Sequence, residues 1–149
     1  MQSAISRPID LNPNFAAAYG YVGWARVFDG RSGEALPSFD QAMRMSPRDP
    51  LNGFFSAGIS AAHYFAGQYL EAVKWGRQAV QLRPGILGGY RILSASLAQA
   101  GNIEEAQLVL SQLRELHPGV SVAWIERNVP YTSNPMSKFL DGLSKAGLQ

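Results

Sequence analysis

Cysteine is absent from the 149-residue chain. The protein therefore has no disulfide framework and no thiolate ligand for a metal ion, and this composition suits the reducing cytoplasm, where we expect it. Neither sign of charge is in large excess, because 13 basic and 11 acidic residues leave a net charge of +2. The basic residues are scattered from Arg7 to Lys145. A chain without a basic stripe is not expected to bind nucleic acid.

Long apolar runs are missing as well. The first eleven residues contain Arg7, Pro8 and Asp10, where a signal peptide would need apolar side chains. The most apolar stretch, residues 53–67, is interrupted by polar side chains and is too short to cross a bilayer. Neither export nor a membrane is predicted. The chain has the length of one domain, and 46% hydrophobic against 16% charged residues favour an ordered core.

Signatures of catalysis are equally scarce. The chain has no glycine-rich phosphate loop, no nucleophile elbow and no catalytic triad that spacing would support. His63 and His117 lie in no recognised metal-ligand spacing. Glu104 and Glu105 fall at a predicted helix N-terminus, where backbone amides stabilise acidic side chains. We therefore predict that the chain is not an enzyme and that it holds no cofactor and no metal ion.

An internal repeat is the strongest feature that the sequence does have. Four prolines recur at nearly equal intervals, and a glycine and an alanine each keep a constant distance before the last three of them. These markers are Pro13, Pro47, Pro84 and Pro118, then Gly30, Gly67 and Gly101, then Ala35, Ala72 and Ala106. Three markers that share one phase predict a series of similar structural units.

The first full unit carries a recognisable pattern, and its residues are Tyr19, Val22, Gly23, Gly30, Ala35, Phe39, Ala42 and Pro47. This pattern resembles the tetratricopeptide-repeat (TPR) family, whose unit is a helix, a tight turn and a second helix. The second unit departs from it with Ser56 at the aromatic place and Ser60 at the first glycine, and the third unit has Ser94 at that glycine. The resemblance implies an all-α fold, a right-handed α-solenoid of TPR helix-turn-helix units with a C-terminal capping helix.

Local signals refine this prediction. Gly30, Gly67 and Gly101 are expected in the left-handed conformation that ends a helix, and Asn102 with Glu105 has the spacing of a capping box. The interval from Pro47 to Gly67 is longer than the corresponding interval in the other two units, and the extra residues lie in 48–55. Asp49-Pro50 in this segment predicts an N-cap, one additional helical turn and a local bend.

The resemblance organises residues 1–149 as a single TPR domain. Its parts are the second helix of a truncated unit (1–13), three full units (16–49, 50–86 and 87–120), and an interrupted unit with the capping helix (121–149). The truncated start indicates a piece of a longer protein. In the last helix, Met136, Phe139, Leu140 and Leu143 form an apolar stripe that Gly147 ends. Residues 139–148 are also similar to the tails of TPR regions in bacterial nucleotidyl cyclases and related regulators.

Membership of this family implies a concave binding surface lined by the first helix of each unit. The groove is apolar and aromatic, and it lacks the Lys and Asn pattern by which some relatives clamp a C-terminal carboxylate, so we expect a protein or peptide segment with apolar anchors. Trp75 and Trp124 are expected to pack between units. The candidate partner-binding residues are Trp24, Phe28, Phe54, Tyr64, Phe65 and Arg91, with Arg91 as a polar anchor.

Three alternatives stay open at this point. The chain's own terminal helix, or a missing upstream helix, could already fill the groove. The domain could instead act in cis as the C-terminal regulatory or sensory part of a larger bacterial signalling protein, a nucleotidyl cyclase or a transcriptional regulator. Exposed faces at the interrupted repeat end could also pair two copies into a homodimer.

Overall fold

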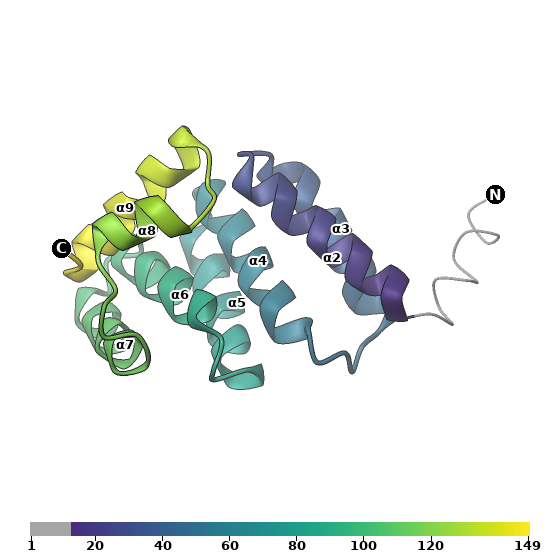
Figure 1. Cartoon of the computed structure of the whole chain (residues 1–149), viewed down its shortest axis with the longest axis horizontal. Coiled ribbons are helices and arrows are strands. Elements are labelled where there is room, and N and C mark those ends of the chain that lie inside the picture. Colours follow the sequence, from purple (N-terminus) through teal and green to yellow (C-terminus); the bar gives the residue numbers. More distant parts are fainter. Residues whose placement is uncertain (1–12) are drawn as a thin grey trace.

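Eight helices make up the described part of the chain, residues 13–149, in this computed structural model (Figure 1). The predicted second helix of a truncated unit, residues 1–13, lies outside the described residues except for Pro13. No strand occurs within residues 13–149. The helices are α2 (Pro13–Phe28), α3 (Ser32–Met45), α4 (Asn52–Phe65), α5 (Tyr69–Leu82), α6 (Leu87–Gln99), α7 (Ile103–Leu116), α8 (Val122–Asn128) and α9 (Ser133–Ala146).

The first six of these helices form three consecutive pairs, in which α2 packs on α3, α4 on α5 and α6 on α7. The turn within each pair is the same, and its glycine has a φ of 79° at Gly30, 77° at Gly67 and 90° at Gly101. In each turn the residue after the glycine donates its N–H to the carbonyl five residues earlier, as Gln68 does to His63 at 2.9 Å. This is the Schellman pattern, so the predicted left-handed glycines are confirmed.

Glycines allow neighbouring helices to approach closely around Phe39 of α3. This side chain is fully buried. It lies between Gly23 of α2 and Gly58 of α4, where an added Cβ on Gly23 would come within 2.9 Å of its ring and one on Gly58 would overlap it. The Phe39 ring therefore fills the space that both missing side chains leave, and it joins the first unit to the second.

Serine stands in the second and third units where the first unit has Gly23, and the structure shows how the hydroxyl is accommodated. Ser60 donates to the carbonyl of Ala72 at 2.6 Å, and Ser94 donates to the carbonyl of Ala106 at 3.0 Å. Both serines are fully buried. Each hydroxyl thus finds an acceptor at the start of the second helix of its own unit, which avoids the cost of burying it unpaired.

The prediction for Asp49 and Pro50 is wrong in its detail. Helix α4 begins only at Asn52. The Asp49 side chain accepts from the backbone N–H of Leu51 at 2.9 Å, and its carbonyl accepts from the N–H of Asn52 at 3.0 Å. Asp49 therefore forms a turn closed by its own side chain, a conformation that competes with helix capping in aspartate. Most of the additional length lies in the connection before α4 and not in a further helical turn.

The C-terminal helix α9 returns over the third unit instead of continuing the series of pairs. It packs mainly on α6, with further contacts to α7, α8 and α4 (Figure 1). Phe139 and Leu143 of the predicted stripe are buried, and Gly147 ends the helix with a φ of 110°. Gly142 permits the close approach, because a Cβ there would overlap the Tyr64 hydroxyl and lie 3.0 Å from Ala95. The fold is an α-solenoid whose C-terminal helix caps it.

Candidate partner-binding groove

The first helices of the three units, α2, α4 and α6, carry all six predicted site residues. Trp24 and Phe28 lie on α2, with ring centroids 5.1 Å apart. Phe54 of α4 stacks on Trp24 at 5.2 Å, and its carbonyl accepts a hydrogen bond from the Trp24 indole N–H at 3.0 Å. Contacts between α2 and α4 thus build one aromatic wall of the groove.

A segment from the far end of the chain lies in the same groove. Tyr131, in the connection between α8 and α9, places its ring 5.1 Å from those of Phe28, Phe65 and Phe139. The next residue, Thr132, donates its backbone N–H and its hydroxyl to the carbonyl of Phe28, at 2.8 and 3.1 Å. The chain's own C-terminal segment therefore covers Phe65 and one side of Phe28.

Tyr64 has a different environment from the one that the sequence predicted. Its side chain is only 2% exposed. The hydroxyl donates to the carbonyl of Lys138 in α9 at 2.6 Å and accepts from the side-chain amide of Gln99 at 3.2 Å. The prediction that Tyr64 contacts a partner is corrected here, because α9 occupies that position. The sequence alone could not show where α9 would dock.

Burial of this hydroxyl predicts a pH dependence of folding. Burial raises the pKa of Tyr64 to about 12. Since the folded pKa lies above the unfolded value of about 10, the stabilisation is complete below pH 10 and is lost as the pH rises towards 12. We expect the free energy of unfolding in urea to fall by roughly 2 kcal/mol over this range through Tyr64.

A Tyr64→Phe variant should show a shallower loss of stability above pH 10, although it starts lower because Lys138 loses its donor. Tyr21→Phe is the matched control, because the Tyr21 side chain is 53% exposed. Urea unfolding followed by circular dichroism between pH 9 and 12 measures the effect. Equal slopes for the wild type and Tyr64→Phe would contradict a buried hydroxyl at this position.

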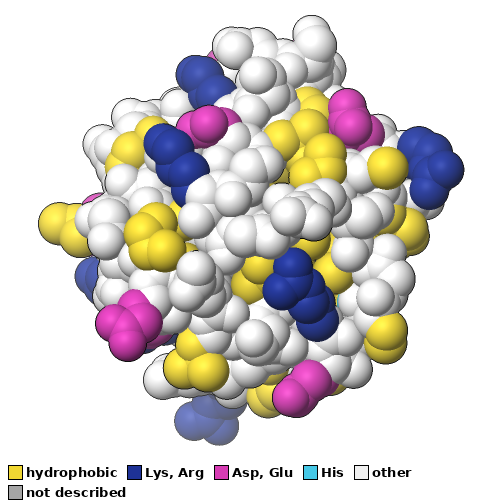
Figure 2. Space-filling view, turned by 90° about the vertical axis from the view of Figure 1, so that its left-hand side faces the viewer, with side chains coloured by type: hydrophobic (Ala, Val, Ile, Leu, Met, Phe, Trp, Pro, Cys, Tyr) yellow, Lys and Arg dark blue, Asp and Glu magenta, His cyan; other side chains and the backbone are white. Residues whose placement is uncertain are grey.

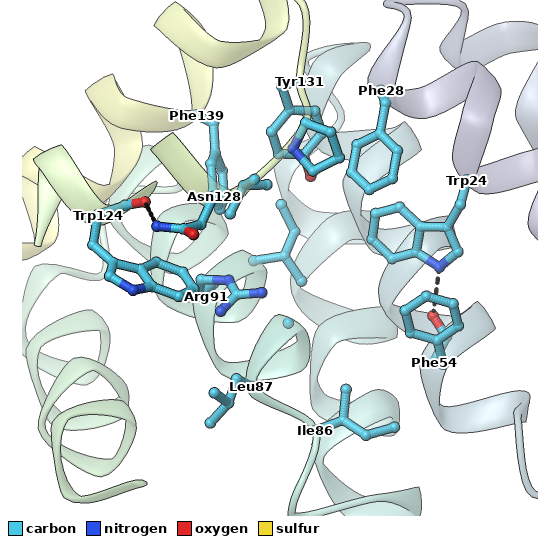
Figure 3. A pocket seen from close by; sticks show the side chains of 14 residues that line it. Trp24, Phe28, Phe54, Ile86, Leu87, Arg91, Trp124, Asn128, Tyr131 and Phe139 are labelled. Atoms are coloured by element: carbon cyan, nitrogen blue, oxygen red, sulfur yellow. Dashed lines mark hydrogen bonds between the residues drawn. The ribbon is translucent and has the colours of Figure 1, made fainter. Parts of the chain in front are cut away.

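The rest of the concave face remains open as a cavity of about 380 Å³ (Figure 3). Trp24, Phe28 and Phe54 form one side of it, and Trp124 of α8 lies opposite them. The guanidinium of Arg91 lies 5.8 Å from the centre of the Trp124 ring. Burial lowers the pKa of Arg91. Four of the predicted residues, Trp24, Phe28, Phe54 and Arg91, are thus brought together around one cavity.

Sequence reasoning missed residues that the C-terminal segment contributes to this cavity. Trp124 was expected to pack between units, and it does pack on His117, with ring centroids 4.4 Å apart. Trp124 also lines the cavity, and so does Asn128. The Asn128 side-chain amide donates to the backbone carbonyl of Trp124 at 2.9 Å. Nothing in the local sequence pointed to Tyr131.

Asn102 and Glu105, two polar residues singled out in the sequence, make contacts that stabilise the fold. Asn102 caps α7 by accepting from the backbone N–H of Glu105 at 3.4 Å, which confirms the predicted cap. The Glu105 carboxylate accepts from Arg77 of the preceding unit, and this ion pair lowers the pKa of Glu105. Among the described residues there is no group of three or more His, Cys, Asp or Glu side chains that could hold a metal ion.

Surface charge and helix apolarity bear on two other classes of site, nucleic-acid interfaces and membrane spans. On the face shown in Figure 2, basic side chains are scattered among acidic ones and form no patch. In the described part of the chain, no helix has both the length and the apolar character needed to cross a membrane.

Three helix pairs with repeated turns and an aromatic concave groove define a helical-repeat protein. No family model matches the sequence, and no curated protein matches it. Solved structures share the fold, and two of them are each 19% identical to this chain with a TM-score of 0.67. One is the first TPR of Spaghetti (RPAP3) bound to the HSP90 peptide SRMEEVD, with 89% of this chain and 96% of that chain covered.

The other is an NMR structure of the first TPR domain of the human RPAP3 protein, with 91% of this chain and 97% of that chain covered. The chain therefore has the fold of a TPR domain over nearly its whole length, and the fold implied by the repeat pattern is confirmed.

Proposed function

We propose that the chain is a protein-interaction module that binds a peptide segment of a partner in the open part of its concave groove. The observation that carries this proposal is the cavity of about 380 Å³ between Trp24, Phe54 and Trp124. Large aromatic side chains that converge on a concave surface supply contact area at low entropic cost. A peptide bound to one TPR domain of the same fold supports the same use here.

Only part of the groove is accessible to a partner while α9 and Tyr131 are docked. Tyr131 and α9 cover Tyr64, Phe65 and one side of Phe28, so the proposed contacts are Trp24, Phe54, Arg91 and Trp124. A helix is about 10–12 Å wide, and a cavity of this volume cannot enclose one. We therefore expect side chains of the segment to enter the cavity while its backbone stays outside.

Filling the cavity tests the proposal without removing any contact of the fold. A Cβ added at Gly88, the second residue of α6, has only the Arg91 guanidinium nearby, at 3.9 Å. Gly88→Leu should thus place its side chain in the cavity and abolish peptide binding. Gly33→Leu is the matched control, because Gly33 is the second residue of α3 and an added Cβ there meets nothing within 4 Å.

Peptides selected by phage display on the wild-type chain provide the probe, and isothermal calorimetry provides the affinity. We expect at least a tenfold loss for Gly88→Leu and wild-type affinity for Gly33→Leu. Unchanged binding to Gly88→Leu, with its fold verified by circular dichroism, would place the binding surface elsewhere.

Other aspects of the proposed function follow from the sequence and stay predictions. We propose that the module has no catalytic activity and acts in the cytoplasm. The alternative of a cis-acting regulatory domain is the less favoured one, because a TPR domain of the same fold holds a peptide from another protein. Homodimerisation is tested by light scattering.

A further inference from the structure

Arg91 differs from the other arginines within residues 15–149 in being half-buried without a polar partner. Six of them form a hydrogen bond or an ion pair with a carboxylate, a hydroxyl or a backbone carbonyl: Arg26, Arg31, Arg44, Arg77, Arg83 and Arg114. Arg48 and Arg127 have no such partner, but both are exposed and solvated. Arg91 alone combines burial with unpaired donors in the described part of the chain.

The surroundings of Arg91 explain why it lacks a partner. Among the described residues that line the cavity, it is the only charged side chain, and none is acidic. The Trp124 ring covers one face of the guanidinium. A cation–π contact engages the face of this group and leaves its in-plane N–H donors unused. In Figure 3 these nitrogens point into the open space between Trp124 and the wall formed by Trp24 and Phe54.

A cation that is withdrawn from water without a counter-charge destabilises the protein, and the lowered pKa of Arg91 reflects that loss of solvation. An anion that enters the cavity would offset this cost and would form charge-assisted hydrogen bonds with the free donors. Tyr131 also lines this cavity.

We infer that the cavity selects an acidic segment, in which a Glu or Asp side chain binds Arg91 while a neighbouring large apolar side chain packs on Trp24, Phe28 and Phe54. This inference rests on the proposed function and adds the chemistry of its ligand. One unpaired guanidinium matches one carboxylate, and the aromatic wall beside it matches one apolar side chain. The two requirements together define a short motif.

Defined peptides test the inference directly. The probe is a set of acetylated, amidated nonapeptides of Ala and Ser that carry one Glu and one Phe, Leu or Trp at every pair of positions. A second set has Gln in place of Glu, and a third has the Gln sequences with a free C-terminal carboxylate. Affinities are measured by fluorescence polarisation for the wild type, Arg91→Gln, Gly88→Leu and Gly33→Leu, after circular dichroism has verified each fold.

The best Glu peptides should bind the wild type about tenfold or more tightly than their Gln counterparts, because Gln can still accept a hydrogen bond from Arg91 but carries no negative charge to pair with it. Arg91→Gln should remove this preference but retain the weaker apolar binding, and Gly88→Leu should remove both. Gly33→Leu should behave as the wild type.

Three results would overturn the inference. Equal binding of Glu and Gln peptides, abolished by Gly88→Leu, would leave the groove as a binding site but refute the role of Arg91. If only the third set, with the free C-terminal carboxylate, bound more tightly than the amidated Gln peptides, selection of an acidic side chain would be refuted. Absence of binding by all three sets, for a chain that also yields no phage-selected peptide, would reject the proposed function and this inference together.

Discussion

Replacement of Phe39 by alanine should lower the free energy of unfolding by about 3–5 kcal/mol, the largest effect that we expect from a single substitution in the repeat core. The side chain is fully buried, and its ring lies 6.1 Å from Trp24 and 6.3 Å from Phe55. Its loss removes contacts within the first unit and contacts between the first and second units at the same time.

The loss in free energy of unfolding should lie near the upper end of that range, because the surrounding residues cannot move in to fill the space that the ring leaves. Gly23 and Gly58 face the ring and have no side chains that could move into the vacated space. The cost of a large-to-small substitution grows with the cavity that remains, and a cavity bounded by helix backbones relaxes little.

Urea unfolding followed by circular dichroism measures this difference. Leu70→Ala is the control, because Leu70 is also on the second helix of a unit but is 79% exposed, and its replacement should change stability by less than about 0.5 kcal/mol. A Phe39→Ala variant that lost no more stability than Leu70→Ala would show that the first two units do not pack through this ring.

Features that recur along the chain could be predicted from sequence, and the turns show why. Gly30, Gly67 and Gly101 hold the same backbone conformation because each unit needs the same tight reversal between its two helices, so spacing alone identified them. Phe39 and Gly23 could be predicted as well, because both match the family pattern in the first unit. Each prediction depended on contacts within one unit or between adjacent units, which the repeat fixes.

Features that occur once could not be predicted in this way. Asp49 was assigned as a helix cap, but whether its carboxylate caps a helix or closes a turn depends on neighbouring geometry in the single connection that is longer than the others. Tyr131 contacts Phe28, which lies far earlier in the chain, through the docking of α9. No period in the sequence relates these two residues, so part of the candidate groove was assigned to a partner when the chain itself fills it.

Phe139→Ala should lower the free energy of unfolding by a similar amount, about 3–5 kcal/mol. The helices that it destabilises should differ from those that Phe39→Ala destabilises. Phe139 is a buried aromatic residue of α9, with its ring 5.1 Å from Tyr131 and 6.4 Å from Tyr64. These contacts hold α9 and the preceding connection against α4. The substitution should therefore weaken the docking of α9 before it weakens the helix pairs.

Hydrogen exchange followed by mass spectrometry separates these two effects. Amides of residues 133–146 should exchange faster in Phe139→Ala than in the wild type, while those of α4 and α5 should keep most of their protection. In Phe39→Ala the increase should instead reach α2, α3 and α4. Leu140→Ala is the control on the same helix, because Leu140 is only half-buried. Uniform loss of protection across all helices would mean that α9 is an inseparable part of the cooperative fold.

Selective loosening of α9 would have a consequence for binding. Tyr64 and Phe65 lie beneath α9 and Tyr131, and their exposure would extend the aromatic wall beyond the cavity around Arg91. A Phe139→Ala variant that opened locally should then bind apolar peptides over a longer stretch and gain affinity, although it is less stable. The fraction of molecules with α9 undocked would set the size of that gain, because binding to a minor state is weakened by the population of that state.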